Sequence, residues 1–199
     1  MTPFYRFCYL LLNVLFRTLG RLKVEGLENL PRQGGFILAG NHQSYLDPPI
    51  VGSSVPKQVY FMAKEELFKV PVLKTLITAQ QAFPVKRGSA DRKALSKALE
   101  LLSQNKVVGI FPEGGRSKTG ELQEAEMGVA FIALKAQVPV LPMAIVGTKG
   151  FACQHLRQIK VKIGKPIYPK IQEKFQKSDI EAMTAQIMDY LSQLIEEIK

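Results

Sequence analysis

Two uninterrupted apolar stretches constrain the fold of this chain more than any other feature. Residues 107–111 read VVGIF and residues 140–146 read VLPMAIV, and neither stretch alternates apolar with polar residues. A strand that has one face in water shows such alternation, whereas a strand buried on both faces does not. These stretches therefore predict a largely parallel sheet with helices covering both of its faces.

Other short segments rich in β-branched and aromatic residues alternate with helical patterns, which is typical of an α/β fold. These further predicted strands are residues 23–25, 35–39, 59–62, 81–85 and 161–163. With the two apolar stretches they give a central, largely parallel mixed sheet of about seven strands. Helices are predicted over residues 90–104 and 126–136. A long C-terminal helix should begin at a capping box of Ser178 and Glu181.

The length of the chain favours a single main domain. It has 199 residues, of which 46% are hydrophobic, and this is enough for one substantial core. No repeat, low-complexity tract or linker divides it. We predict a separate N-terminal helix over residues 1–20 and one domain over residues 21–199.

The N-terminal segment has the composition of a helix at a membrane interface. Residues 7–16 read FCYLLLNVLF, and basic residues flank them on both sides, beginning with Arg6 and Arg17. The segment is too short to span a bilayer, which takes about 20 apolar residues. A signal peptide would need a better cleavage site. We favour a helix lying in one leaflet, with a buried core helix as the alternative.

The net charge of +10 favours an anionic partner without choosing between nucleic acid, anionic lipid and small phosphates. Cys8 and Cys153 lie far apart in sequence with no metal-ligand spacing, so a disulfide framework or zinc site has little support. The chain has only two histidines, His42 and His155, which limits any chemistry that needs a base titrating near neutral pH.

The first motif, GNHQSYLDPP at residues 40–49, follows an apolar strand, where loops of α/β sheets often carry function. Pro48 favours a helix start, so we expect Asp47 to be the N-cap of that helix. One carboxylate oxygen would cap the helix, and the other would accept the imidazole N–H of His42, leaving the second ring nitrogen free as a base. Alternatively, Asp47 is only a cap and His42 only a loop residue.

A second motif, GIFPEGGRS at residues 109–117, also follows an apolar strand. Its glycines at 114 and 115 permit positive φ angles and a close approach of the backbone. Arg116 offers a fork of donors that matches a phosphate group.

Together, the His-x4-Asp and FPEG-x-R-S motifs closely resemble those of the glycerolipid acyltransferase family, best known for lysophosphatidic acid acyltransferase. FPVKRG at residues 83–88 is similar to the family's second motif, and VPVLPM at residues 138–143 to its fourth. The motifs occur in the expected order between about residues 24 and 167. One departure is Gly115, where the family commonly has threonine or serine.

The resemblance implies transfer of a fatty acyl group from acyl-CoA or acyl carrier protein to the sn-2 hydroxyl of lysophosphatidic acid, giving phosphatidic acid. It implies His42 and Asp47 as catalytic residues. The implied substrate-binding residues are Lys86, Arg87, Glu113, Gly114 and Arg116. We expect no cofactor and no metal. The expected partners are lysophosphatidic acid, the acyl thioester and an anionic membrane surface, but no nucleic acid. We expect a peripheral or monotopic protein on the cytoplasmic face of the cell membrane.

Several alternatives remain at this point. One alternative is an acyltransferase whose acceptor is glycerol 3-phosphate or an ornithine-type lysolipid. Another is a non-enzymatic basic protein that binds membranes. Ser44 and Ser117 lack the GxSxG elbow of a serine nucleophile. A metal site of His42, Asp47 and Glu113 has no supporting HExxH spacing.

Overall fold

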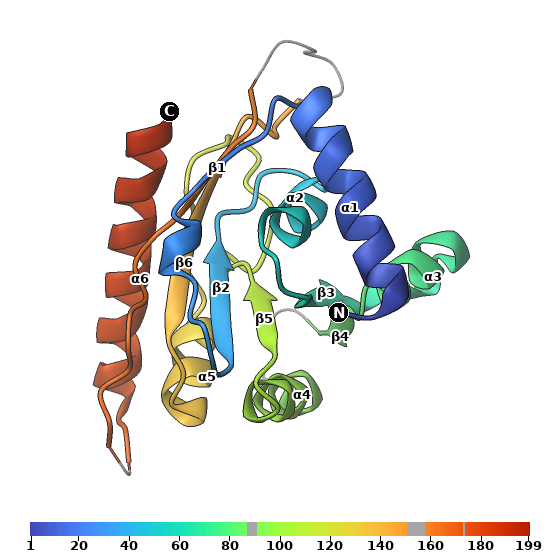
Figure 1. Ribbon diagram of the computed structural model, residues 1–199. Coiled ribbons are helices and arrows are strands. Elements are labelled where there is room, and N and C mark those ends of the chain that lie inside the picture. The colour runs from blue at the N-terminus through green and yellow to red at the C-terminus, as the bar shows by residue number, and fades with distance from the viewer. Residues whose placement is uncertain (87–90, 151–157, 173) are drawn as a thin grey trace.

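The computed structural model describes residues 1–86, 91–150, 158–172 and 174–199. The strands in this part of the chain are β1 (Lys23–Glu25), β2 (Phe36–Gly40), β3 (Val59–Lys64), β4 (Phe83–Val85), β5 (Val107–Ile110), β6 (Val140–Val146) and β7 (Lys160–Ile163). They form one sheet in the order β1-β7-β6-β2-β5-β3-β4. Neighbouring strands are parallel except for β6 and β7, which are antiparallel. The predicted α/β fold with a largely parallel sheet is confirmed (Figure 1).

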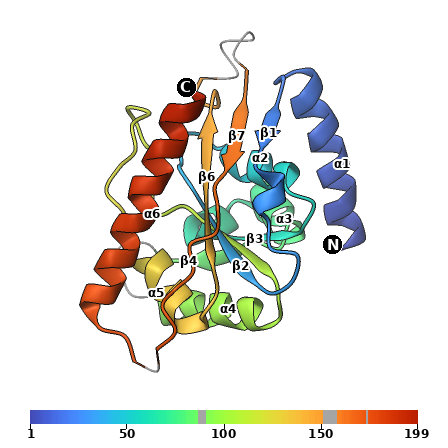
Figure 2. The same cartoon turned by 60° about the vertical axis from the view of Figure 1, so that its left-hand side comes forward.

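The helices are α1 (Pro3–Thr18), η1 (Leu27–Asn29), α2 (Asp47–Ser54), η2 (Glu65–Lys69), α3 (Pro71–Ala79), α4 (Arg92–Ser103), α5 (Gly128–Ala136) and α6 (Lys177–Ile198). Helix α6 lies on one face of the sheet and α1 on the other (Figure 2). Helices α4 and α5 share the face of α6, while α2 shares the face of α1.

Strand β2 shows why its sequence has no polar alternation. Ile37 and Ala39 belong to the apolar cluster beneath α4, α5 and α6, whereas Phe36 and Leu38 belong to the cluster beneath α1 and α2. All four side chains are at most 1% exposed. Burial on both faces removes every position at which a polar residue would be solvated, as the apolar stretches predicted.

Helix α1 packs on the body of the protein along one side only. Tyr5 and Phe16 are buried, and the Asn13 side chain donates a hydrogen bond of 2.8 Å to the carbonyl of Ser53 in α2. Much of the remaining apolar surface is exposed, including Phe7 and Val14 at 62% each. No helix in the described residues combines the length and apolar character that crossing a bilayer requires. The interfacial role of α1 therefore stays a prediction.

The predicted capping box of α6 is wrong. The helix starts at Lys177, so its N-cap is Gln176, whose backbone N–H donates to the Asp179 carboxylate at 2.7 Å. Ser178 consequently lies inside the first turn. Glu181 forms an ion pair of 3.3 Å with Lys177. The buried apolar positions of the helix face the core, and they are Met183, Ile187, Leu191, Leu194, Ile195 and Ile198.

Candidate active site

The two motifs meet because the strands that precede them are neighbours. Strands β2 and β5 pair in parallel, with Ala39 opposite Ile110. Their carboxyl ends consequently lie at the same edge of the sheet. The loop of residues 41–46 after β2 and the loop of residues 111–127 after β5 emerge there side by side. Loops at this edge are the usual place for a binding site in a parallel sheet.

His42 and Asp47 form a buried hydrogen-bonded pair in the first of these loops. Nδ1 of His42 lies 2.8 Å from Oδ2 of Asp47, and the two residues are 7% and 0% exposed. An ionised carboxylate can only accept hydrogen bonds, so Nδ1 of His42 carries a proton and donates it in the hydrogen bond to Asp47. In the neutral ring, Nε2 then has a free lone pair. This arrangement is the one that a histidine general base requires.

Asp47 is not the N-cap of α2, contrary to the prediction from Pro48. The cap is Leu46, and Asp47 is the first residue of the helix. Its Oδ2 turns back onto the preceding loop and accepts the N–H groups of Gln43 at 2.6 Å and Ser44 at 2.7 Å. Its Oδ1 is buried and has no hydrogen-bond partner among the described residues. The carboxylate thus organises the loop instead of capping the helix, because three donors of the loop converge on one oxygen.

The second loop holds the main chain of His42. The backbone N–H of His42 donates to Oε1 of Glu113 at 2.6 Å, and its carbonyl accepts from the Ser117 N–H at 2.7 Å. The Phe111 ring stacks on the imidazole with a centroid separation of 4.1 Å and an interplanar angle of 17°. The main chain of His42 is therefore fixed by residues some 70 positions away in sequence.

Glu113 is buried, at 8% exposure, and both of its oxygens accept backbone hydrogen bonds. Oε1 accepts from His42 and Oε2 accepts from the Gln123 N–H at 3.0 Å. Burial raises the pKa of this carboxyl above its ordinary value, and the two backbone hydrogen bonds offset the rise only in part. The sequence predicted a substrate-binding residue here, but the structure gives both oxygens partners within the protein.

Gly114 occupies a position that only glycine fits without strain. Its φ is +62°, and a Cβ atom would lie 2.5 Å from Oε1 of Glu126. The sharp turn lets the chain reverse after Glu113, so that Ser117 comes back to the carbonyl of His42. The role of Gly114 in the loop is therefore conformational.

Arg116 lies at the surface of the second loop and is supported by Tyr45 of the first. Its Nη2 donates to the Tyr45 hydroxyl at 2.9 Å, and its guanidinium carbon is 3.6 Å from the centre of the tyrosine ring. Both side chains are exposed. Within the described residues this guanidinium makes no other hydrogen bond, so its remaining donors can bind an anion arriving from solvent.

Lys86 follows directly on β4, as the second motif predicted. Its backbone N–H donates to Oδ2 of Asp91 at 2.9 Å, and its exposed ammonium lies 3.9 Å from a carboxylate oxygen of Glu65. Arg87, the other basic residue of that motif, lies outside the described residues. His155 and Cys153 lie outside them as well.

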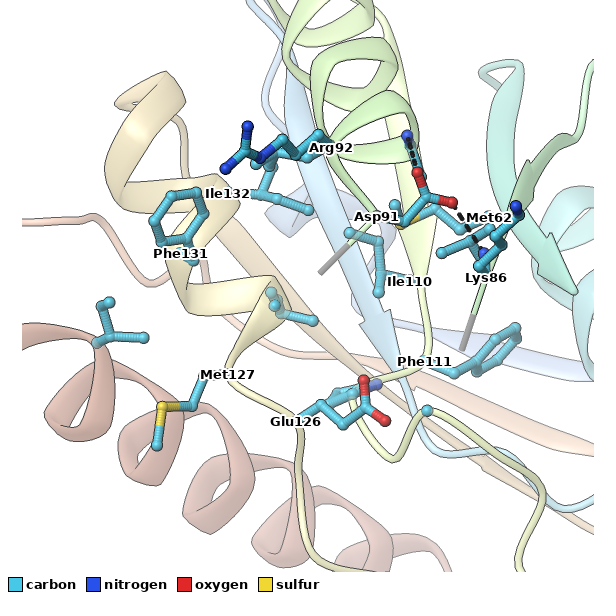
Figure 3. A pocket seen from close by; sticks show the side chains of 18 residues that line it. Met62, Lys86, Asp91, Arg92, Ile110, Phe111, Glu126, Met127, Phe131 and Ile132 are labelled. Carbon is cyan, nitrogen blue, oxygen red and sulfur yellow. Dashed lines mark hydrogen bonds between the residues drawn. The ribbon is translucent and has the colours of Figure 1, made fainter. Parts of the chain in front are cut away.

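An apolar pocket of about 410 Å³ opens beside the loop after β5 (Figure 3). Its walls come from β3, β5, α4, α5 and α6, and include Met62, Leu95, Ile110, Phe111, Phe131, Ile132 and Ile180. Lys86, Asp91 and Arg92 lie on one side of it, and Glu126 on another. Phe111 lines this pocket and also stacks on the imidazole of His42, so one side chain contacts both the pocket and the candidate base, while His42 itself is not a lining residue.

Sequence reasoning missed three residues that shape the site. Asn41 is buried and forms two hydrogen bonds with Ile145 of β6, at 2.9 Å to its carbonyl and 2.7 Å from its N–H. Phe111 and Tyr45 are the other two. Each lies within a motif, so its position was visible, but its partner in another segment was not.

The fourth motif, which includes the start of β6, contributes to the core. Val140, Leu141 and Met143 are fully buried and pair with β2 or pack against it. This segment does not line the pocket in the described part of the structure. Its connection to the site is the bond between Asn41 and Ile145 further along the strand.

Comparison with known proteins identifies the family. A family model described as Acyltransferase matches residues 21–146, more than half of the chain. The 1-acyl-sn-glycerol-3-phosphate acyltransferase of Bacillus subtilis (strain 168) is 31% identical over 197 residues, covering 98% of this chain and 96% of that protein. The protein of the same name from Borreliella burgdorferi is 26% identical over 186 residues, covering 90% of this chain and 73% of its own.

A solved structure agrees with these relatives. The crystal structure of the 1-acyl-sn-glycerophosphate (LPA) acyltransferase PlsC from Thermotoga maritima superposes with a TM-score of 0.78 at 28% identity. The match covers 98% of this chain and 80% of that one. The family match, the near full-length relative and the shared fold agree, and this chain therefore belongs to the acyltransferase family.

Proposed function

We propose that this protein transfers a fatty acyl group from a thioester to the sn-2 hydroxyl of lysophosphatidic acid, giving phosphatidic acid for phospholipid biosynthesis. The observation that carries the proposal is the buried pair of His42 and Asp47, with a hydrogen bond of 2.8 Å, beside an apolar pocket. The names of the relatives in Bacillus subtilis and Borreliella burgdorferi support this acceptor.

The reaction is a direct attack by the acceptor. Nε2 of His42 removes the hydroxyl proton as the oxygen attacks the thioester carbonyl carbon, and Asp47 stabilises the imidazolium that forms. The tetrahedral intermediate collapses by breaking the carbon–sulfur bond, and the thiolate leaves with the proton returned by His42. A general base of this kind contributes about 10²- to 10⁴-fold to the rate. No acyl-enzyme forms in this scheme.

Three basic side chains are proposed to hold the acceptor phosphate: Lys86, Arg87 and Arg116. Arg116 is exposed and supported on Tyr45, and Lys86 lies at the side of the pocket. Charge-assisted contacts to the phosphate would place the hydroxyl near His42 and so lower the entropic cost of the reaction. Glu113 does not join this set, because its carboxylate is already bonded and carries the same sign of charge as phosphate.

The apolar pocket is proposed to receive a fatty acyl chain. Its volume of about 410 Å³ lies in the usual range for ligand sites. Its walls are largely aliphatic and aromatic, and Phe111 links it to His42. A chain lying there would bring its carbonyl end toward the imidazole. The acyl donor is proposed to be acyl-CoA or acyl carrier protein, without any cofactor.

We propose that the protein works on an anionic membrane surface at the cytoplasmic face of the cell membrane. The exposed apolar side of α1 and the net charge of +10 support this proposal. Apolar side chains of a helix lying in the interface bury area in the acyl region, and basic residues are attracted to anionic headgroups. The lipid acceptor would then reach the site without leaving the membrane.

One assay tests the reaction. Purified protein is incubated with liposomes containing lysophosphatidic acid and, in separate arms, an acyl-CoA or an acyl carrier protein thioester, and both free thiol and phosphatidic acid are measured. Matched arms replace the acceptor with glycerol 3-phosphate or an ornithine-type lysolipid. We expect phosphatidic acid in step with thiol release. If thiol is released only with one of the other acceptors, the proposed acceptor is wrong. If no acceptor gives thiol release, the proposed acyltransferase activity is wrong.

The catalytic pair is tested in the same assay. His42→Ala should lower kcat by at least about 10²-fold, since it removes the general base. The matched control is His155→Ala, which changes the one other histidine of the chain. A His42→Ala variant with near-normal turnover would exclude this mechanism.

A further inference from the structure

The strongest unassigned relationship in the protein joins a buried carboxylate to the main chain of His42. Glu113 is 8% exposed, and its Oε1 accepts from the His42 N–H at 2.6 Å. Its Oε2 accepts from the Gln123 N–H at 3.0 Å. One side chain thus ties together the loop after β2, the start of the loop after β5 and a later part of that same loop.

The same loop also holds the carbonyl of His42. The Ser117 N–H donates to it at 2.7 Å, so both backbone polar groups of His42 are bonded to residues 113–117. On the other side of β2, Asn41 is bonded twice to Ile145 of β6. The backbone around His42 is therefore fixed toward both neighbouring strands, while Asp47 and Phe111 fix its ring.

Glu113 is an unfavourable choice if stability alone is considered. Burying a carboxylate disfavours its charged form, and here burial raises the pKa of Glu113 despite two backbone hydrogen bonds. A neutral acceptor could satisfy one of these N–H groups without that cost. A charged group with two equivalent acceptor oxygens is, however, well suited to hold two donors from different segments in a fixed geometry.

We propose that Glu113 is a positioning residue, which acts on catalysis by holding the His42 main chain so that the imidazole keeps its contact with Asp47. This inference rests on the proposed role of His42 as the base. It assigns Glu113 to turnover and not to substrate binding. Small displacements of a catalytic group are costly, so loosening this bond should slow the chemical step.

The test compares Glu113→Gln with Glu124→Gln, which removes the same charge from an exposed position of the same loop. In Glu113→Gln one amide oxygen still accepts, but the amide NH₂ faces the second backbone donor. We expect kcat to fall on the order of 10- to 100-fold, with KM for lysophosphatidic acid nearly unchanged. Glu124→Gln should match the wild type in both parameters. An unchanged kcat, or a raised KM as the main effect of Glu113→Gln, would overturn the inference.

A spectroscopic measurement separates positioning from loss of fold. The chain has two histidines, so ¹⁵N spectra of the imidazole rings are simple. In a His155→Gln background, the only imidazole signals are those of His42. In the neutral ring of the wild type, we expect a protonated Nδ1 and an unprotonated Nε2. In Glu113→Gln the two nitrogen signals should move toward each other, because the ring samples both tautomers once its hold on Asp47 loosens.

The thermal midpoint of unfolding, Tm, shows whether the variant keeps the stability of the wild type. Removing a buried charge offsets the lost hydrogen bond, so the Tm of Glu113→Gln should stay within about 4 °C of the wild type. Identical imidazole spectra in the two proteins would reject the positioning role whatever the rates are. If instead the spectra differ but wild type transfers no acyl group, the proposed reaction fails and the positioning of His42 stands.

Discussion

The guanidinium of Arg116 rests on the ring of Tyr45, with its central carbon 3.6 Å from the ring centre and Nη2 donating to the hydroxyl at 2.9 Å. Tyr45 belongs to the loop of the candidate base, and Arg116 to the loop after β5. The residue proposed to bind phosphate is thus held by the loop that carries His42. This contact couples the position of the anion site to the position of the base.

Arg116→Ala should raise KM for lysophosphatidic acid by about 10-fold or more, because it removes charge-assisted hydrogen bonds to the phosphate. Tyr45→Ala should raise KM by about 2- to 5-fold through loss of the cation–π support, and Tyr45→Phe by less, since the ring remains. Steady-state kinetics over a range of acceptor concentrations measure these effects. An unchanged KM in Arg116→Ala would reassign this arginine to loop structure.

Ile180→Trp should shorten the acyl chain that the protein prefers. Ile180 of α6 is half-buried and lines the apolar pocket, so a larger side chain there reduces its volume. Rates measured with a series of thioesters at a fixed acceptor, and with a series of acceptors at a fixed thioester, show which chain enters. Leu76→Trp, at an exposed position of α3, is the control. Unchanged preferences in both series would mean that neither chain occupies this pocket.

Gly114→Ala should destabilise the protein by about 1 kcal/mol or more, because alanine at a φ of +62° is strained. The added methyl also approaches Glu126, whose exposed side chain can move away. Urea unfolding gives the free energy difference. Gly115→Ala is the matched control, since Gly115 has no positive φ. Equal stability losses at the two positions would contradict a conformational requirement specific to Gly114.

Tyr5 links α1 to the core, and its ionisation should make stability fall at high pH. Its hydroxyl accepts from the Val59 N–H at 3.1 Å, and burial raises its pKa to about 12. A raised pKa means that its contribution is complete below the unfolded-state value of about 10 and is lost as pH rises toward 12. At pH 8, Tyr5→Phe should be less stable than wild type by about 1 to 3 kcal/mol, because the buried Val59 N–H loses its acceptor.

The stability difference between Tyr5→Phe and wild type should then narrow by about 1.4 kcal/mol at pH 11, since only the wild type must keep this phenol protonated in the fold. Urea unfolding at both pH values measures it. A difference that stays constant between pH 8 and pH 11 would show that Tyr5 ionises as readily in the fold as in the unfolded chain.

The double variant Phe7→Ser/Val14→Ser should weaken binding to anionic liposomes by roughly 10-fold or more, because it removes apolar side chains from the exposed side of α1. Both residues are 62% exposed, so the fold should be retained. Co-sedimentation with liposomes measures the binding, and circular dichroism checks the fold. Leu76→Ser in α3 is a control of similar exposure. Undiminished sedimentation of the double variant would exclude α1 as the anchor.

Local sequence patterns predicted most of the sheet. The strands β1 and β6 have the predicted bounds, and the other five strands differ from their predicted ranges by at most two residues at either end. Helix α3 was not predicted, since it is short, starts at Pro71 and buries none of its residues fully. Its nine residues fall below the length of about 10 to 12 at which an apolar pattern distinguishes a helix from a strand.

Helix starts were predicted less well, because they depend on which donors compete for a side chain. Pro48 suggested Asp47 as a cap, but three donors of the preceding loop hold its carboxylate instead. Ser178 and Glu181 had the spacing of a capping box, yet Gln176 and Asp179 form it two residues earlier. A cap is decided by backbone geometry within one or two residues, which the residue types alone leave open.

The sequence by itself determined the fold class and the burial of the central strands, because both follow from residue types within a few positions of one another, and it put His42 and Asp47 within reach of each other. Only the tertiary structure decided what holds that pair in place. The hydrogen bond from His42 to Glu113 spans 71 residues and that from Asn41 to Ile145 spans 104. Such contacts exist because β2 lies between β5 and β6, and strand order is a property of the folded sheet, which no local pattern contains.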